Sequence, residues 1–432
     1  MHTESHNPAR LAVTFDDDRA VAGAGLALAG LLSDRLDLVA WADELVDLGD
    51  RPGHARPGRK VATLVHAMVA GAECIDDCDV LRSGSTGSVL GHGVMAPSTL
   101  GTFLRSFTFG HVRQLDSLAE QMLGNAWDFG AGPGDAPMTI DIDSTIQQVY
   151  GKQKQGAAYG YTGVLGEHPL VATRADTGEV LHIRQRKGSA GSGRGAQRFV
   201  RTIGRSRRAG ATGQLTLRAD SGFHSKYVVK ACRDHDVRYS ITATLNKAVV
   251  KAIEAIPEES WTDIDYPVGG KAQVAECAYG DGHRLVIRRT RLVGKQAQLF
   301  PSWRHHAFIT DREGTAVFLD ADHRHHAVVE LAIRDLKDGA GMAHCPSGTF
   351  TANAAWAVLA TLAHNLIRWL AALGIQHTGT VVAKTIRRKY IAMPGRLTHR
   401  SRRAQLHLPT RWPWATEWTE CFDRLRSLSF RT

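Results

Sequence analysis

The chain has 432 residues, 43% of them hydrophobic, a composition that excludes a disordered protein and gives room for two or three domains. Its 53 lysines and arginines exceed its 43 acids, and the formal net charge of +10 favours a polyanionic partner such as nucleic acid. The six cysteines form no CxxC pair, which argues against a disulfide framework and a cysteine-rich zinc site, so we expect a cytoplasmic protein.

Residues 1–134 are predicted to form a helical domain. Apolar side chains recur at helical spacing in two runs, which include Leu28, Leu31, Leu32, Val61, Leu64, Val65 and Met68. A basic, turn-rich segment, residues 51–60, lies between the runs. Helix packing is the simpler interpretation of this region. Binding of a DNA end is the alternative, favoured by the basic segment and by its place ahead of the strands that follow.

A linker and a sheet are predicted next. Three glycines and two prolines within residues 130–137 cannot continue a helix, so we place a boundary near residue 134. The runs that follow predict strands at 138–143, 168–174, 179–186, 213–219 and 237–243, with helices at 195–208 and 224–235. This order is typical of an RNase H-like mixed sheet flanked by helices, and it assigns residues 135–245 to the first part of a catalytic core.

Two acidic residues each end a predicted strand at a polar turn. Asp143 ends the first strand, in Thr-Ile-Asp-Ile-Asp-Ser-Thr, and Asp220 ends the fourth, in Arg-Ala-Asp-Ser-Gly-Phe. In an RNase H-like sheet these strands are neighbours, so the two acids, 220 − 143 = 77 residues apart, should meet. Asp141 faces the same side of the sheet by strand alternation and is an alternative metal ligand. Asp220 with Ser221 and Gly222 also fits a simple helix-capping turn.

The pattern then changes to β, and a second helical part of the core follows. Residues 246–315 read as a β-rich insertion with strands at 285–287, 297–300 and 306–310. Residues 316–376 are assigned to the second part of the core, with a helix at 322–337. Polar side chains at spacings near whole helical turns share one face of that helix: His323, His326, Glu330, Arg334 and Lys337. Residues 354–373 are apolar but interrupted by polar side chains, which predicts a buried helix and no membrane partner.

Residues 377–432 are predicted to be a basic C-terminal region. Between positions 384 and 403 the chain carries eight lysines and arginines and no acid. A one-sign run is commonly a solvated surface, but on a basic protein it also suits phosphate binding. The predicted phosphate contacts in this run are Arg387, Arg388, Arg400, Arg402 and Arg403.

Carboxylates on a basic chain suggest metal-dependent phosphoryl transfer on nucleic acid. A hard divalent cation such as Mg²⁺ prefers carboxylate oxygens, and Asp143, Asp220 and Glu330 are the candidates that could hold two such ions beside a phosphodiester. The histidine pairs at 305–306 and 323–326 lack nearby cysteines, so zinc is the less favoured interpretation. The glycine-rich segment 188–195 lacks the ending of a P-loop, so no nucleotide cofactor is expected, and the segment reads as a loop at the sheet edge.

The motifs together resemble a DDE transposase of the IS4-like group, closest to the IS1380 insertion-sequence family. The resemblance covers nearly the whole chain, and the residues that carry it are Asp141–Thr145, Tyr159-Gly160-Tyr161, His168-Pro169-Leu170, Arg218–Phe223, Asn353-Ala354-Ala355 and Ala363–Leu366. It implies an RNase H-like core and cut-and-paste transposition, with cleavage at terminal inverted repeats and strand transfer into target DNA. It also implies Mg²⁺ held by Asp143, Asp220 and Glu330, with Mn²⁺ able to substitute, and a homodimer on the DNA in the bacterial nucleoid. Residues 1–134 would then bind the transposon end.

The chain departs from that group's helix signature at two positions. The signature has tyrosine, arginine, glutamate and lysine where this chain has His323, His326, Glu330 and Lys337. In related transposases a tryptophan of the insertion stacks on the cleaved DNA end, a role that would fall here to Trp303. The alternative for Trp303 is that it packs the insertion against the catalytic sheet. A catalytically impaired DNA-binding derivative and an RNase H-like nuclease remain as alternative functions.

Overall fold

The computed structural model describes residues 8–429, apart from Pro52, Lys152, Tyr161, Ile203, residues 266–269, Asp281 and residues 292–302. The strand predicted at 297–300 and Tyr161 of the resemblance motif lie outside the described residues.

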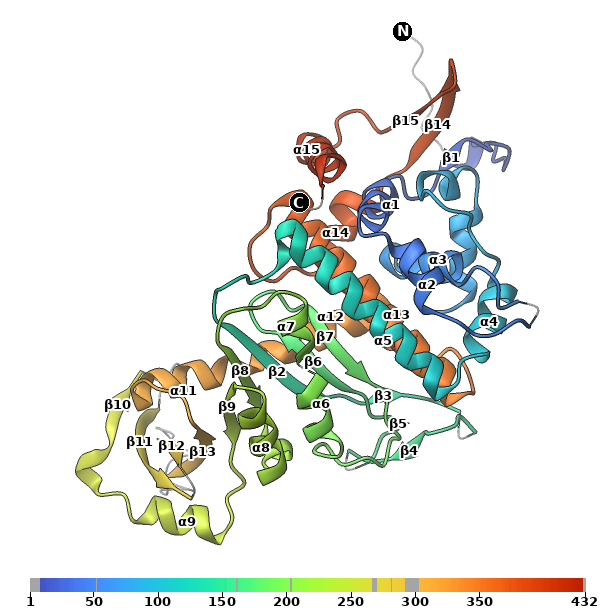
Figure 1. Cartoon of the computed structure of the whole chain (residues 1–432). Helices are drawn as coiled ribbons and strands as arrows, with labels where there is room; N and C mark the ends of the chain where they lie inside the picture. Colours follow the sequence, from blue (N-terminus) through green and yellow to red (C-terminus); the bar gives the residue numbers. More distant parts are fainter. Residues whose placement is uncertain are drawn as a thin grey trace.

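A nine-stranded mixed sheet organises the middle of the chain (Figure 1), and its strands follow the order β10-β11-β12-β13-β9-β8-β2-β6-β7. Strand β2 runs parallel to β8 and antiparallel to β6, and β8 runs parallel to β9. The strands predicted between 138 and 243 are confirmed, as is the RNase H-like order. The core strands are β2 (Met138–Ser144), β6 (Leu170–Arg174), β7 (Val180–Arg184), β8 (Leu215–Ala219) and β9 (Val237–Thr242).

The segment predicted as a β-rich insertion extends this sheet. Its strands are β10 (Thr262–Ile264), β11 (Lys271–Tyr279), β12 (His283–Arg291) and β13 (Arg304–Thr310). The strands predicted at 285–287 and 306–310 lie within β12 and β13 and are confirmed. Strand β13 pairs antiparallel with β9, with Ile309 opposite Ile241, so the insertion continues the core sheet at its edge.

The same segment also contains a helix that the sequence pattern did not indicate, α9 (Lys247–Glu254). The side chain of Asn246 accepts hydrogen bonds from the backbone N–H groups of Ala248 and Val249, which caps the first turn. Val249 and Ile253, one helical turn apart, are buried. A cap and two apolar positions are enough for an eight-residue helix that packs on its neighbours.

Helices cover one end of the sheet and pack around a long apolar helix, α13 (Phe350–Trp369). The helical prediction for the N-terminal region is confirmed by α1 (Leu26–Arg35), α2 (Leu38–Leu45), α3 (Pro57–Ala70), α4 (Pro97–Arg105) and α5 (Phe109–Ala126). Helix α5 lies beside α13, between these helices and the sheet (Figure 1). One cluster of buried apolar side chains runs from α1 through α13 into β2 and β8. The N-terminal helices therefore share their core with the sheet.

The prediction of a buried helix at 354–373 is confirmed by α13. Within the described part of the chain, the stretch Phe350–Ile375 is long and apolar enough to cross a membrane by length and composition. However, 89% of its apolar window is buried inside the protein, as in the core helix of a globular fold.

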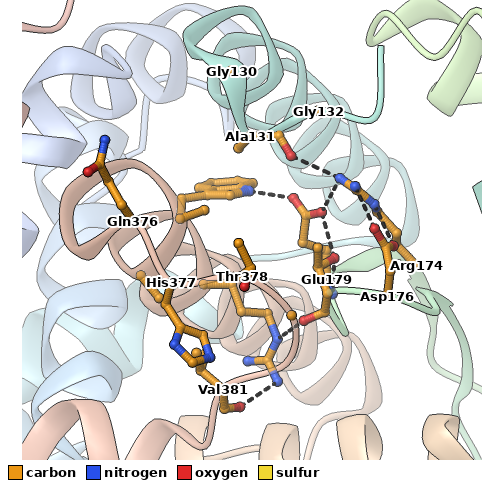
Figure 2. A pocket seen from close by; sticks show the side chains of 16 residues that line it. Gly130, Ala131, Gly132, Arg174, Asp176, Glu179, Gln376, His377, Thr378 and Val381 are labelled. Carbon is orange, nitrogen blue, oxygen red and sulfur yellow. Dashed lines mark hydrogen bonds and ion pairs between the residues drawn. The ribbon is translucent and has the colours of Figure 1, made fainter. Parts of the chain in front are cut away.

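The glycine-rich linker is fixed to the sheet by a buried carboxylate, Glu179, beside a cavity of about 440 Å³ (Figure 2). Glu179 accepts hydrogen bonds from the indole nitrogens of Trp127, at the end of the α5 region, and Trp369, at the end of α13. It also accepts one from Arg174, whose guanidinium donates to the carbonyl of Ala131 in the linker. Helices and sheet are thus joined by polar contacts as well as by apolar packing.

The remaining elements surround this framework. The helix predicted at 322–337 begins earlier, because Thr315 caps α11 (Ala316–Arg324); a 3₁₀ turn at His325–Ala327 separates α11 from α12 (Val328–Ala340). The basic C-terminal region forms a hairpin of β14 (Gly395–Arg400) and β15 (Arg403–His407), which projects from the helical end (Figure 1). The others are α6 (Ala196–Thr202), α7 (Gly204–Arg208), α8 (Lys226–Asp234), α14 (Ala383–Ile386), α15 (Ala415–Ser427), β1 (Ala20–Val21), β3 (Gln147–Gln148), β4 (Ala158–Tyr159) and β5 (Leu165–Glu167).

Candidate active site

The three predicted carboxylates lie on three elements that meet at one edge of the sheet. Asp143 is the penultimate residue of β2, Asp220 directly follows β8, and Glu330 is in the first turn of α12. The parallel register of β2 and β8 pairs Ile142 with Ala219, so Asp143 and Asp220 stand one step further along two adjacent strands. The structure brings together acids that are 77 residues apart in sequence, because 220 − 143 = 77.

Asp220 and Glu330 are close enough to Asp143 for their charges to affect its pKa. It is raised from 3.8 to about 6, mainly because the carboxyl is buried, and also by the negative charges of Asp220 and Glu330. The backbone N–H of Ser144, 2.6 Å from Oδ1, and the imidazole of His326 act in the opposite direction. The carboxylates therefore share one electrostatic environment in which negative charge is only partly compensated.

The side chains of Asp143, Asp220 and Glu330 do not converge closely enough to form a complete metal site by themselves. Asp220 Oδ1 accepts a hydrogen bond from Gly222 N at 2.9 Å, so the predicted capping turn forms alongside its place at the site. Glu330 is exposed. In the part of the chain that the structure describes, no group of three or more histidines, cysteines and acids is spaced to hold a metal ion. Carboxylate oxygens of this kind nevertheless have the chemistry that a hard divalent cation requires.

Directly behind the three acids lies a buried ion pair between Asp141 and Arg218. The guanidinium donates to both carboxylate oxygens, at 2.8 and 2.9 Å, and His326 Nδ1 donates to Asp141 Oδ1 at 2.8 Å. Arg218 also donates to the carbonyl of Asp322 in α11. Asp141 is completely buried. The alternative of Asp141 as a metal ligand is therefore wrong, because its oxygens already bind two side chains of the protein.

The members of this cluster stand at fixed offsets from the three acids. Asp141 is two residues before Asp143, and Arg218 is two residues before Asp220, offsets that put side chains on the same face of a strand. His326 lies one helical turn before Glu330. The cluster thus fixes β2, β8 and the start of α12 relative to one another. Arg218 was missed as a site residue, although an arginine inside the apolar strand before Asp220 was a usable signal.

His323 does not face the site. It is buried, hydrogen-bonded to Ser240 Oγ and Thr242 Oγ1 of β9, and stacked on Phe308 with ring centroids 4.1 Å apart. Burial, with the charges of nearby cationic groups, lowers the pKa of His323 to about 2, so the ring is neutral. The interpretation of His323 as a phosphate contact is wrong, because its ring fills the interface between α11 and the sheet.

The other predicted residues of this helix differ in their surroundings. Lys337 Nζ donates to the carbonyl of Ile146 at 2.7 Å; burial lowers its pKa, and the charges of Asp338 and Asp143 raise it, which places its ammonium near the carboxylates. Arg334 is exposed at a cavity of about 270 Å³ that Asp335 and Asp338 also line.

Trp303 directly precedes β13, in the part of the sheet that the insertion adds, and has a partner within the chain. The guanidinium of Arg289 lies 4.5 Å from the centre of the Trp303 ring and 4.1 Å from the centre of the Trp261 ring. Arg289 also forms a bidentate ion pair with Glu258. These contacts give Trp303 a packing role among residues of the inserted segment itself. Its stacking on DNA stays a prediction.

The basic C-terminal residues divide into two groups. Arg387 donates to the carbonyls of Val69 and Met68, at 2.8 and 3.1 Å, and to that of Gly339. Its guanidinium therefore joins α3 to α12, and its interpretation as a phosphate contact is wrong. The other four predicted contacts are exposed: Arg388, Arg400, Arg402 and Arg403.

Comparison with known protein families gives a match across nearly the whole chain. The family described as "Transposase DDE domain group 1" matches residues 4–430. Among solved structures, a cryo-EM structure of the piggyBac transposase synaptic complex with hairpin DNA is similar at 12% identity and a TM-score of 0.46. That alignment covers 86% of this chain and 80% of that one. No curated protein matches.

The raised pKa of Asp143 predicts a pH-dependent effect of Asp143→Asn on the metal-free protein. The folded protein binds this proton more tightly than the unfolded chain, so the favourable contribution present below pH 3.8 is lost as the pH rises through about 6. Asparagine removes the cost of burying the charge and keeps the oxygen that accepts from Ser144. With a chelator present, urea unfolding near neutral pH should show a gain of up to roughly 3 kcal/mol that shrinks toward pH 4. The exposed Asp423→Asn control should show no such gain, and a destabilised Asp143→Asn would contradict the assignment.

The buried pair predicts a large effect of Arg218→Met. The substitution leaves the buried Asp141 carboxylate with only His326, and such uncompensated charges cost about 3–5 kcal/mol. The control Arg82→Met breaks an exposed ion pair with Asp79 and should cost at most about 1 kcal/mol. Adding Asp141→Asn to Arg218→Met should restore part of the stability, because the unpaired charge is gone. Additive destabilisation in the double variant would argue that the two residues do not act as a pair.

Proposed function

We propose, from the premise that this chain belongs to the Transposase DDE domain group 1 family, that Asp143, Asp220 and Glu330 are its catalytic carboxylates. The family match spans residues 4–430, and the protein is accordingly a DDE transposase, a DNA-cleaving and strand-transferring enzyme. The observation that supports these three residues is their shared electrostatic environment, in which Asp220 and Glu330 both raise the pKa of Asp143.

We propose that these carboxylates hold two Mg²⁺ ions, for which Mn²⁺ can substitute. These residues suit Mg²⁺ because their side chains offer carboxylate oxygens, the ligands that this ion prefers. The surrounding protein compensates the negative charge of these oxygens only in part. When bound, the ions neutralise charge on the phosphodiester and activate the attacking oxygen. The protein's own residues position this chemistry: the Asp141–Arg218 pair sets the spacing of β2 and β8, and His326 sets the start of α12. Because Nδ1 of His326 donates to Asp141, only its Nε2 is left to form a hydrogen bond with DNA.

We also propose that the protein acts in cut-and-paste transposition of an IS4-like element nearest the IS1380 family. It would work in the bacterial cytoplasm as a homodimer on paired inverted repeats, as the motif resemblance implies. The three acids favour an active enzyme over a DNA-binding derivative. The hydrogen bonds of His323 and His326 explain how two histidines are tolerated at these positions, since both side chains make structural contacts within the protein.

The β14–β15 hairpin is the DNA contact that we propose for the C-terminal region. Cross-strand pairing places Arg400 opposite Arg403, Arg396 opposite His407 and Thr398 opposite Gln405. These pairs alternate along the strands and so share one polar face of the ribbon. Like charges directly opposite destabilise a hairpin unless a counter-charge is present, and a polyanion supplies one. Strand β1 pairs only with Gly395 and Arg396 at the base of β14, so the rest of the hairpin is two-stranded among the described residues, and a two-stranded ribbon fits the DNA major groove.

Asp220→Asn should abolish metal-dependent cleavage of a duplex that carries the element's end, because the substitution removes a ligand charge from the site. DNA binding measured without cleavage should stay near that of the parent. Asp423→Asn, which removes an exposed acid paired with Arg426 in α15, is the matched control and should cleave normally. If purified Asp220→Asn protein cleaves at the parent rate, the site assignment is wrong.

Replacing Arg400, Arg402 and Arg403 with glutamine should weaken DNA binding for all sequences alike. In anisotropy titrations, the slope of log K against log salt should fall by about 0.9 for each phosphate that the protein no longer neutralises. Arg387→Gln is the contrasting variant, because its guanidinium binds backbone carbonyls. It should lower the melting temperature and leave the slope unchanged. An unchanged slope in the triple variant would assign the hairpin to solvated surface.

A further inference from the structure

A cavity rich in cationic side chains lies at the edge of the core sheet, beside β7 and the glycine-rich loop before α6. Its volume is about 650 Å³, and five of its lining residues carry positive charge: Arg184, Arg186, Lys187, Arg194 and Arg198. The described lining contains no acid. Arg184 has the charge of Asp116 nearby, outside the lining. The like charges around the cavity otherwise repel one another unless an anion occupies it, which indicates a binding site for a negatively charged group.

Arg186 is a buried residue of the cavity lining, and its hydrogen bonds hold the glycine-rich loop in place. Its Nε donates to the carbonyl of His168 at 2.8 Å, and its Nη1 donates to the carbonyls of Ser192 and Arg194 at 2.8 and 2.9 Å. The side chain is buried, with 9% of the residue exposed. Among the described residues, Nη2 has no hydrogen-bond partner. A buried charged donor without an acceptor is costly, and an anion in the cavity is the acceptor that this atom lacks.

The loop that Arg186 holds also contacts the active site. Ser144 Oγ donates to Ser192 Oγ of the loop at 3.3 Å, and Ser144 directly follows Asp143. On the other side, Gly193 lies so close to the carbonyl of Gly222 that an added Cβ would be 2.4 Å from that oxygen. Gly222 belongs to the turn that Asp220 caps. One short loop therefore has the cationic cavity on one side and the turns of two carboxylates on the other.

We propose that this cavity binds a backbone phosphate of the DNA strand that runs into the active site. The inference rests on the proposed function of Asp143, Asp220 and Glu330. The exposed Arg194 and Arg198 contact the phosphate first, and the buried Arg186 completes the site with Nη2. A guanidinium suits this role because its planar donors match phosphate oxygens. The strand held here would be fixed relative to Asp143 and Asp220 through the loop.

The test uses the full-length Arg194→Ala/Arg198→Ala variant, since both side chains are exposed and their removal leaves the buried Arg186 contacts in place. Binding to an end-containing duplex should weaken about tenfold, and the salt slope should fall by about 2, because two cationic side chains no longer neutralise phosphate. The matched control is Arg82→Ala/Arg426→Ala, which removes the same charge from exposed ion pairs on other elements. A control that weakens equally would overturn the proposal, because the effect would then come from net charge.

The contacted phosphate is located with duplexes that carry one neutral methylphosphonate at a time around the cleavage site. In the parent protein, one such substitution should weaken binding. In the Arg194→Ala/Arg198→Ala variant the same substitution should have no further effect, because the partner is already gone. Additive weakening at every position would overturn the assignment.

Three further outcomes distinguish this proposal from a small-anion site and from the proposed function. If pyrophosphate binds the parent in calorimetry and the variant loses this binding while its DNA binding is unchanged, the cavity serves a small anion, and the DNA assignment is wrong. If the parent cleaves DNA through Asp220 and the variant matches the parent in all DNA assays, this proposal fails while the proposed function stands. A parent that fails to bind or cleave any end-containing duplex refutes the proposed function first, and this inference with it.

Discussion

The arrangement of the candidate site depends on the buried ion pair between Asp141 and Arg218. Taking both charges out of water carries a large desolvation penalty, which is offset here by two hydrogen bonds between the partners and by one more from His326. Such a pair contributes little net stability, but it is favourable only when the two side chains keep their hydrogen-bonding geometry. Because it joins β2, β8 and the junction of α11 with α12, it fixes the elements from which Asp143, Asp220 and Glu330 project.

A second constraint couples the helical region to the sheet. The carboxylate of Glu179 is buried and accepts from two indoles that end long neighbouring helices, and the apolar cluster around α13 continues from the N-terminal helices into β2 and β8. Arg387 adds a direct tie between α3 and α12. If the N-terminal helices bind a DNA end, the orientation of that end is therefore passed to the catalytic strands through packed side chains, with no flexible linker between them.

The sequence was sufficient for the strand order and for placing Asp143 and Asp220 at the ends of adjacent strands, and insufficient for the contacts behind them. The catalytic role of the three acids stays a prediction. Asp143 and Asp220 follow apolar runs at polar turns, and local pattern determines such positions. His323 and Arg387 were misassigned because their partners, Ser240 in β9 and Val69 in α3, are 323 − 240 = 83 and 387 − 69 = 318 residues away. The β14–β15 hairpin was missed because its turn residues, Ser401 and Arg402, have positive φ angles without the glycine or asparagine that usually indicates such a turn.

The distribution of charge explains how a basic chain can keep a cluster of carboxylates ready for metal ions. The basic side chains nearest the acids have other partners: Arg218 and His326 bind Asp141, and Lys337 donates to the carbonyl of Ile146. The pKa of Asp143 is raised to about 6, mainly by burial of its carboxyl and further by the charges of Asp220 and Glu330. Arg334 is exposed four residues after Glu330 on α12, and further exposed arginines lie on the β14–β15 hairpin and around the cavity beside β7. In the proposed mechanism, metal ions lie between the carboxylates and a phosphodiester. That mechanism requires Asp143 to have no arginine partner, because such an arginine would compete with the metal, whereas an arginine one loop away is free to hold the DNA strand as proposed.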